Sequence, residues 1–366
     1  MTPALAFAVA LVVTWLATPL AIRVAHLTGF LDKPAGYKGH AAPTPYLGGS
    51  AIMAGVLVAA IALGGAAHGR WVLIAGAVAL WALGTADDRL NLAPLTRVLA
   101  EVAVAGALFA TNNGWHVGAG VFNLLLTVAW VVAVVNAVNL MDNMDGTSAT
   151  VAGTSALGAG ALALIGHDTG LAVLCLAVGG ACAGFLPRNL ARPSRIFMGD
   201  GGSMPLGLLV AGVAMAASAH SSAGAGAGAV IIGGMLLGLA LLDTTLVTFS
   251  RRVGGRPLLT GARDHLTHRL RTKLGTPRAV AAFLGGTQLL LCLGAIALRQ
   301  LGFGAVLSAG ILILLLGAIT IIRLNRWPWF DRRNGPRLGI EHRRPQKDLL
   351  GRPRQQGVPA GETARA

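Results

Sequence analysis

The chain has 366 residues, of which 54% are hydrophobic and only 12% are charged, whereas about a quarter of the residues of a soluble globular domain are charged. This composition excludes a soluble fold, and the long unbroken apolar runs exclude an outer-membrane β-barrel, whose strands alternate over about ten residues. The net charge of +15 does not indicate a nucleic-acid ligand, because eleven of the 29 basic residues lie beyond residue 322, where we expect anionic lipid headgroups or a disordered tail.

Eleven apolar runs are long enough to cross a bilayer as helices. They lie near residues 3–22, 47–66, 70–85, 96–111, 119–137, 147–166, 169–187, 203–219, 227–248, 279–297 and 301–322. Some are short or rich in glycine, so ten helices are an alternative. The first run has no basic segment before it, and we expect a retained helix rather than a signal peptide. The predicted fold is an all-α polytopic membrane bundle over residues 1–325, followed by a basic, disordered cytoplasmic tail over 326–366.

The basic residues predict the orientation of these helices. Of the 29 lysines and arginines, 27 fall in the loops and the tail on one face, and only Arg70 and Arg299 fall on the other. Basic residues concentrate on the cytoplasmic side of membrane proteins, so the C-terminus should be cytoplasmic and the N-terminus outside. We therefore expect a multi-pass protein of the inner (plasma) membrane.

Most of the few acidic residues fall at the predicted cytoplasmic ends of helices. Two adjacent carboxylates, Asp87 and Asp88, follow the third apolar run. Like charges at this spacing repel each other unless a cation relieves them, so the pair predicts a metal site or a general base. Solvated loop charges are the alternative interpretation.

The fifth apolar run ends in a segment that is dense in amides and carboxylates. Asn139, Asp142 and Asp145 recur every three residues before Gly146, so they line one face if the helix continues. Amides and carboxylates together can orient a metal ion, a phosphate or the edge of a base. An ordinary helix terminus does not need so many polar groups, so we expect a functional site here.

Asp200 lies between Gly199 and Gly201, shortly before the eighth apolar run. Flanking glycines let the backbone approach a ligand, and the following helix N-terminus should offer unpaired N–H groups to an anion. Because magnesium prefers oxygen ligands and shared substrate phosphates, Asp200 is predicted to bind a metal ion. The alternative is an aspartate that caps a helix beginning near Ser203.

The most basic loop precedes the tenth run and carries Arg263, His265, His268 and Arg269. Two histidines three residues apart can bind a metal, but no cysteine or third nearby histidine completes a zinc site. Contact with a phosphate, assisted by the arginines, is the prediction.

These four elements, in this order and on one predicted face, resemble the polyprenyl-phosphate N-acetylhexosamine-1-phosphate transferase family over roughly residues 1–325. Members are similar in their ten or eleven helices, paired aspartates, Asn-x-x-Asp-x-x-Asp-Gly and Phe-Met-Gly-Asp-x-Gly-Ser elements, and a late histidine loop. The segment 32–49 is similar to the first loop of the family. Members often have Arg where Tyr37 and Tyr46 stand here, and Thr267 replaces the middle histidine of a His-x-His-His cluster.

The resemblance implies a catalytic group and a metal ligand. Asp200 would bind Mg²⁺, or Mn²⁺ in its place. Asp87, with Asp88 beside it, would deprotonate the lipid phosphate. Asn139 and Asp142 would lie beside the diphosphate of the donor.

The resemblance also implies the residues that bind the substrates, a UDP-sugar and a polyprenyl phosphate. Phe197 would stack on uracil, with Asp145 and Gly146 near the uracil edge. The groups that would hold phosphates or sugar are Lys38, Arg263, His265, His268 and Arg269. The implied reaction transfers a sugar 1-phosphate to the lipid phosphate at the cytoplasmic membrane face and releases UMP. The lipid-linked sugar would initiate a cell-wall or surface glycan, and a homodimer is compatible with the sequence.

GlcNAc is the expected sugar, because the stretch from Asp264 to Leu270 is similar to the N-acetylhexosamine branch of the family. The alternative within the family is the phospho-MurNAc-pentapeptide branch, which has a triple-histidine loop followed by Phe-Glu. A transporter is the alternative from another class. Its site should lie near the bilayer midplane, whereas the acidic residues here lie at helix ends on one side.

Overall fold

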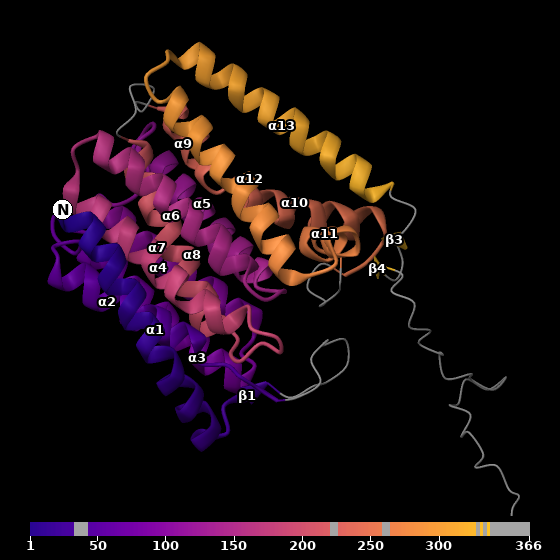
Figure 1. Ribbon diagram of the computed structural model, residues 1–366. Helices are drawn as coiled ribbons and strands as arrows, with labels where there is room; N and C mark the ends of the chain where they lie inside the picture. Colours follow the sequence, from indigo (N-terminus) through magenta and orange to yellow (C-terminus); the bar gives the residue numbers. More distant parts are fainter. Residues whose placement is uncertain (33–42, 220–225, 258–263, 327–329, 332–334, 337–366) are drawn as a thin grey trace, which may run out of the picture.

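The computed structural model describes residues 1–32, 43–219, 226–257, 264–326, 330–331 and 335–336 of the chain. Within these residues it has thirteen helices and two short antiparallel strand pairs (Figure 1). The helices are α1 (Thr2–Thr28), α2 (Gly48–Ala62), α3 (Trp71–Leu90), α4 (Pro94–Ala110), α5 (Gly120–Met141), α6 (Thr147–Ile165), α7 (Thr169–Asn189), α8 (Asp200–Ser218), α9 (Ala227–Leu236), α10 (Gly238–Val253), α11 (Leu266–Leu274), α12 (Pro277–Leu298) and α13 (Phe303–Asn325). The strand pairs are β1 (Leu31–Asp32) with β2 (Thr44–Pro45) and β3 (Phe330–Asp331) with β4 (Gly335–Pro336). The prediction of an all-α polytopic bundle is confirmed.

The expected apolar runs fall on helices of this bundle. Among the described residues, eight helices are long and apolar enough to cross a membrane, and the pair α9 and α10 makes a ninth if it is one span. The shorter α2 and α4 account for the two other expected runs. The run at 227–248 was expected to form one span, and the structure divides it into α9 and α10 with a bend of 84° between them.

The core of the bundle lies around α7 and α8. Helix α8 packs against α3, α5 and α6 and is almost wholly buried, whereas α1 packs against α2 and α7. Helix α13 is mostly exposed and lies at the edge of the bundle, apart from α1 (Figure 1). Its apolar side chains therefore face the surroundings rather than the core, as expected for a helix in contact with lipid.

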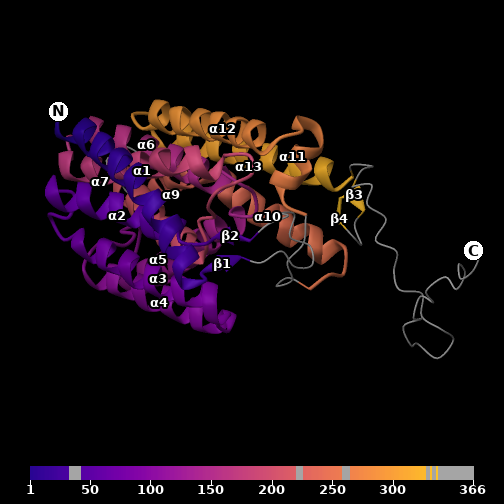
Figure 2. The same cartoon turned by 60° about the horizontal axis from the view of Figure 1, so that its bottom comes forward.

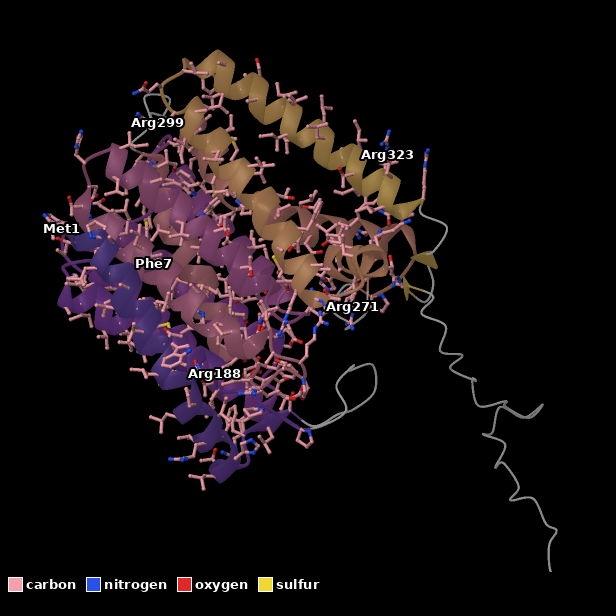
Figure 3. All side chains as sticks on the ribbon, in the orientation of Figure 1. Met1, Phe7, Arg188, Arg271, Arg299 and Arg323 are labelled. Carbon is pink, nitrogen blue, oxygen red and sulfur yellow. The ribbon has the colours of Figure 1, made fainter. Side chains whose placement is uncertain are left out.

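The two ends of the bundle differ in their residues. Met1 and Arg299 lie at one end, and Arg188, Arg271 and Arg323 lie toward the opposite end (Figure 3). The turned view places β1, β2, α10 and α11 away from the N-terminus, toward this second end (Figure 2). The described residues of the predicted motifs therefore lie at the same end of the bundle as most of the arginines of the loops.

Candidate active site

A shared arginine joins two of the predicted site carboxylates. Arg97 at the start of α4 places Nη1 3.0 Å from Asp87 Oδ2 at the end of α3 and 3.0 Å from Asp200 Oδ2 at the start of α8. Asn139, in the last turn of α5, donates from Nδ2 to Asp200 Oδ1 at 2.7 Å and to Ser203 Oγ at 2.9 Å. Four helices thus bring their ends to one point.

Asp88 has a different role from its neighbour Asp87. Its Oδ1 accepts a hydrogen bond from the backbone N–H of Asp200 at 2.8 Å, and its Oδ2 accepts from Gly201 at 3.0 Å. The next two N–H groups of α8 donate to the carbonyl oxygen of Gly199. The expectation that this helix N-terminus offers unpaired N–H groups to an anion is therefore wrong, because protein oxygens already accept from them.

Helix α8 begins at Asp200, three residues before the expected start, and Asp88 rather than Asp200 caps it. The close packing of α3 on this turn requires glycine. A Cβ atom on Gly84 would lie 2.3 Å from the carbonyl oxygen of Asp200, and one on Gly201 would lie 2.4 Å from Thr85 Oγ1. These small residues let the carboxylates of α3 reach the start of α8.

Asp142 and Asp145 do not extend the face of α5 that carries Asn139, because this helix ends at Met141. Asp142 is the residue after the last turn, and Asp145 lies in the following bend. Burial raises the pKa of Asp142 well above its usual range, and the nearby negative charges of Asp200, Asp145 and Asp88 raise it further. The site therefore has more carboxylates than nearby positive charges.

This surplus of carboxylate oxygens fits a magnesium ion, which takes oxygen ligands. Asp200 is partly exposed, with 29% of its side chain accessible, whereas Asp87 is 6% accessible. Among the described residues, no three His, Cys, Asp or Glu side chains form a group that could hold a metal. An ion bound through Asp200 would therefore complete its shell with substrate phosphate oxygens and water, as magnesium commonly does.

The segment that carries Phe197 is fixed by backbone hydrogen bonds to β2 and to the start of α2. The N–H of Phe197 donates to Pro45 O at 2.8 Å, and Gly48 N donates to Phe197 O at 3.0 Å. The rings of Tyr46 and Phe197 lie 6.1 Å apart at 57°. Tyr46 thus contributes an aromatic face beside the residue that is predicted to stack on uracil.

Gly146 directly precedes α6 and adopts a conformation that favours glycine, with a φ of 77°. Its N–H donates to Asn189 Oδ1 at 2.6 Å, and Asn189 Nδ2 donates to Ile196 O at 2.9 Å. A Cβ atom at Gly146 would lie 2.4 Å from Leu190 Cδ2. Asn189 therefore links the turn after Asp145 to the segment of Phe197, which brings two predicted uracil contacts to one place.

A second group of polar residues, the late-loop cluster, comprises Asp243, Arg251, Asp264, His265 and Arg269. Arg251 donates to Asp264 with Nε at 2.9 Å and Nη2 at 3.0 Å. Burial raises the pKa of Asp264, but the hydrogen bonds and the charge of Arg251 outweigh it and hold this pKa below its usual value. Arg269 donates to Asp264 O and to Ser250 Oγ, and burial lowers its pKa to about 10, so it stays charged at neutral pH.

The histidines of this cluster differ in their surroundings. His265 Nδ1 lies 2.8 Å from Asp243 Oδ2, and its ring is 6.5 Å from that of His268. Thr267, which stands in place of a histidine, donates its hydroxyl hydrogen to Asn143 Oδ1. This bond joins α11 to the turn between Asp142 and Asp145, so the late-loop cluster adjoins the carboxylates.

Several residues of the site were not among the predicted ones. Arg97, Ser203 and Asn189 contact predicted site residues, and Asp243 holds His265. Only Asp243 gave a signal, as an isolated acid within an apolar run. Two predicted residues, Lys38 and Arg263, lie outside the described part of the chain, and all proposed roles in substrate binding stay predictions.

Comparison with known proteins places the chain among membrane glycosyl transferases. The model of glycosyl transferase family 4 matches residues 70–218. A probable undecaprenyl-phosphate N-acetylglucosaminyl 1-phosphate transferase of Bacillus subtilis is 30% identical over 72% of this chain and 76% of its own length. A decaprenyl-phosphate N-acetylglucosaminephosphotransferase of Mycobacterium tuberculosis is 33% identical over 71% of this chain and 74% of its own. A phospho-N-acetylmuramoyl-pentapeptide-transferase of Limosilactobacillus fermentum is 35% identical over only 44% and 51%. The chain belongs to glycosyl transferase family 4.

Proposed function

We propose that this protein transfers GlcNAc 1-phosphate from UDP-GlcNAc to polyprenyl phosphate and releases UMP. The observation that carries the proposal is the convergence of Asp87, Asn139 and Asp200 on one point at the end of the bundle, with Arg97 between the two carboxylates. Relatives that match most of this chain are named as transferases of this kind. The product, a polyprenyl-diphosphate-linked sugar, would initiate a cell-wall or surface glycan.

The position of the site suits two substrates of different solubility. A nucleotide sugar arrives from water, and a lipid phosphate lies at the depth of the headgroups, so both can meet only where helices end at the membrane surface. The transporter alternative needs a polar site near the midplane. Here Asp87 lies in the last turn of α3 and Asp200 begins α8. This placement favours a transferase.

The side chains have distinct tasks in this proposal. Asp87 accepts the proton of the lipid phosphate, and Arg97 holds that carboxylate and Asp200 in register. Asn139 fixes the orientation of Asp200. Asp200 would hold magnesium or manganese, which would supply positive charge to the diphosphate of the donor. Catalysis of phosphoryl transfer then consists mostly of positioning and electrostatic stabilisation.

The direct test is the purified protein incubated with polyprenyl phosphate and one of UDP-GlcNAc, UDP-GalNAc or UDP-MurNAc-pentapeptide. We expect UMP release that depends on the lipid and on a divalent cation, and a lipid product whose mass has increased by that of GlcNAc 1-phosphate. A product formed only from UDP-MurNAc-pentapeptide would assign the protein to the other branch of the family. UMP release that needs no lipid acceptor would contradict the transferase reaction.

We also propose that the site faces the cytoplasm in the inner membrane, because the loops at this end contain most of the basic residues. The native cysteines are buried, so introduced ones can be labelled selectively. Arg271→Cys replaces an exposed side chain at the site end of the bundle (Figure 3). His116→Cys replaces an exposed side chain in the loop between α4 and α5, at the far end of α4 from Arg97. A membrane-impermeant thiol reagent on intact cells should label only the position at 116. Labelling of 271 alone would invert the topology.

A further inference from the structure

Asp243 is a buried carboxylate that the proposed reaction does not use. It lies in α10, within the half of the bent pair that follows the 84° break, and its side chain is fully buried. Its Oδ2 lies 2.8 Å from His265 Nδ1, and its Oδ1 accepts a hydrogen bond from the backbone N–H of Leu266 at 2.6 Å. A buried carboxylate is costly unless hydrogen bonds satisfy it, and both of its oxygens are engaged here.

This contact decides which nitrogen of His265 carries a proton. An ionised carboxylate can only accept hydrogen bonds, so Nδ1 must be the donor in the pair. In the neutral imidazole, Nε2 then has a free lone pair. The His265 ring is only 5% accessible, and no partner of Nε2 is found among the described residues. The ring is thus fixed along one edge and has an acceptor on the other.

The position of this acceptor is set by the rest of the cluster. Thr267 binds Asn143, which places the start of α11 beside the turn that contains Asp142 and Asp145. The neighbouring cation Arg251 is engaged by Asp264 in a two-pronged ion pair. A lone pair at this place fits a hydroxyl group. While the ring is neutral, this lone pair does not fit an ionised phosphate oxygen, which is itself an acceptor.

We propose that Asp243 is a positioning residue that holds His265 as the Nδ1–H tautomer, so that Nε2 accepts a hydrogen bond from a hydroxyl group of the sugar nucleotide. This inference rests on the proposed transferase function for the identity of the ligand. It refines the expectation that His265 binds either phosphate or sugar, and it makes Asp243 a determinant of substrate recognition.

The alternative is that Asp243 serves only to cap α11. Asp243→Asn separates the two roles, because the Asn carbonyl oxygen can still accept from Leu266 N while its NH₂ group donates to His265 Nδ1. The proton of the neutral imidazole must then move to Nε2, which can no longer accept. We expect near-normal thermal stability and a loss of about 100-fold or more in kcat/KM for the sugar nucleotide. Unchanged kcat/KM would overturn the proposal.

A double-mutant cycle tests whether Asp243 acts through His265. His265→Asn retains an amide that can donate to Asp243 but lacks an atom at the place of Nε2. We expect this variant to lose about as much activity as Asp243→Asn, and the double variant to lose little more. If Asp243→Asn costs the same factor in the His265→Asn background as in the wild type, the two residues act independently and the proposal is wrong.

Deoxy analogues of the donor identify the hydroxyl group. Removal of the hydroxyl group that binds Nε2 should lower the activity of the wild type strongly. The same removal should lower the already reduced activity of Asp243→Asn only slightly. UDP-GlcNAc with a 2′-deoxyribose tests the nucleoside, and donors deoxygenated in the hexose test the sugar. If every analogue loses the same factor in the variant as in the wild type, Nε2 reads no hydroxyl of the donor.

A spectroscopic measurement needs no turnover. In protein labelled with ¹⁵N-histidine, long-range ¹H–¹⁵N correlations distinguish the two tautomers, and the His265→Asn spectrum assigns the signal among the nine histidines. We expect Nδ1–H in the wild type and Nε2–H in Asp243→Asn. Nε2–H in the wild type would overturn the inference. A wild type that shows Nδ1–H but makes no lipid product would instead refute the proposed function.

Discussion

Replacement of Asp200 by asparagine tests the proposed metal ligand with little change of shape. Asp200 accepts from Asn139 through Oδ1 and faces Arg97 through Oδ2. The amide oxygen of asparagine can keep the first contact, whereas the negative charge is lost. Because Asp88 provides the cap of α8, the start of this helix does not depend on the side chain of Asp200.

The structure allows the two consequences of this change to be separated. Arg97 and Asp200 are 28% and 29% accessible, and an ion pair with this much exposure contributes no more than about 1 kcal/mol to stability. We therefore expect Asp200→Asn to unfold at nearly the wild-type temperature. Loss of the metal ligand should reduce turnover by about two orders of magnitude or more, which corresponds to roughly 3 kcal/mol of transition-state stabilisation.

Asp168 provides a matched control at the opposite end of the bundle. It caps α7, accepts from Leu171 N at 2.9 Å and pairs with Arg70, so it resembles Asp200 in lying at a helix start beside an arginine. Asp168→Asn should alter stability without loss of turnover. UMP release is measured for both variants across a magnesium titration. Wild-type rates for Asp200→Asn at ordinary magnesium would refute the assignment of this residue as the metal ligand.

Four further variants test other parts of the site. Arg97→Ala leaves two facing carboxylates without their shared cation. We expect the free energy of unfolding, measured by thermal unfolding, to fall by about 1–3 kcal/mol and UMP release to fall at least about 10-fold. Unchanged values would contradict the bridging role of Arg97. His265→Ala and His268→Ala should each lose activity while the purified protein stays folded and zinc-free. If the wild type contained one zinc ion per chain and either substitution removed it, the prediction of phosphate or sugar binding would be refuted. Arg251→Gln should cost about 3 kcal/mol at neutral pH, because it breaks a buried pair. Because the pKa of Asp264 is lowered in the folded protein, this stabilisation is present above the unfolded carboxyl pKa of about 3.9 and disappears as the pH falls through the folded value. The free energies of unfolding of wild type and variant, measured with denaturant, should therefore converge in acid and not in base.

The sequence was sufficient to predict the helices because a bilayer demands long apolar runs. It did not predict the break between α9 and α10, since the residues around Leu237 are as apolar as those of an unbroken span. The bend matters for the site, because α10 carries Asp243 to the late loop. In the structure, Gln288 of α12 supports the break, because it donates to the carbonyl oxygens of Met235 and Leu236 and accepts from Leu239 N.

The sequence predicted those residues of the site that lie in local polar motifs and missed those that do not. Asp200 and Asn139 lie in dense polar motifs, and the structure brings these motifs together. Arg97 was missed because it is a single basic residue among 29 and has no local pattern around it. Asp243 and His265 are 22 positions apart, so only the fold shows that they form a pair. Residues that act through a distant partner leave little signal in a single sequence.

The paired aspartates show how neighbouring acids can acquire separate tasks. Both oxygens of Asp88 accept from the backbone at the start of α8, so this side chain fixes the place of Asp200. Asp87 instead shares Arg97 with Asp200 and is the carboxylate beside the proposed metal ligand. The adjacency that first suggested a metal site is therefore better explained as one acid that builds the site and one that lines it.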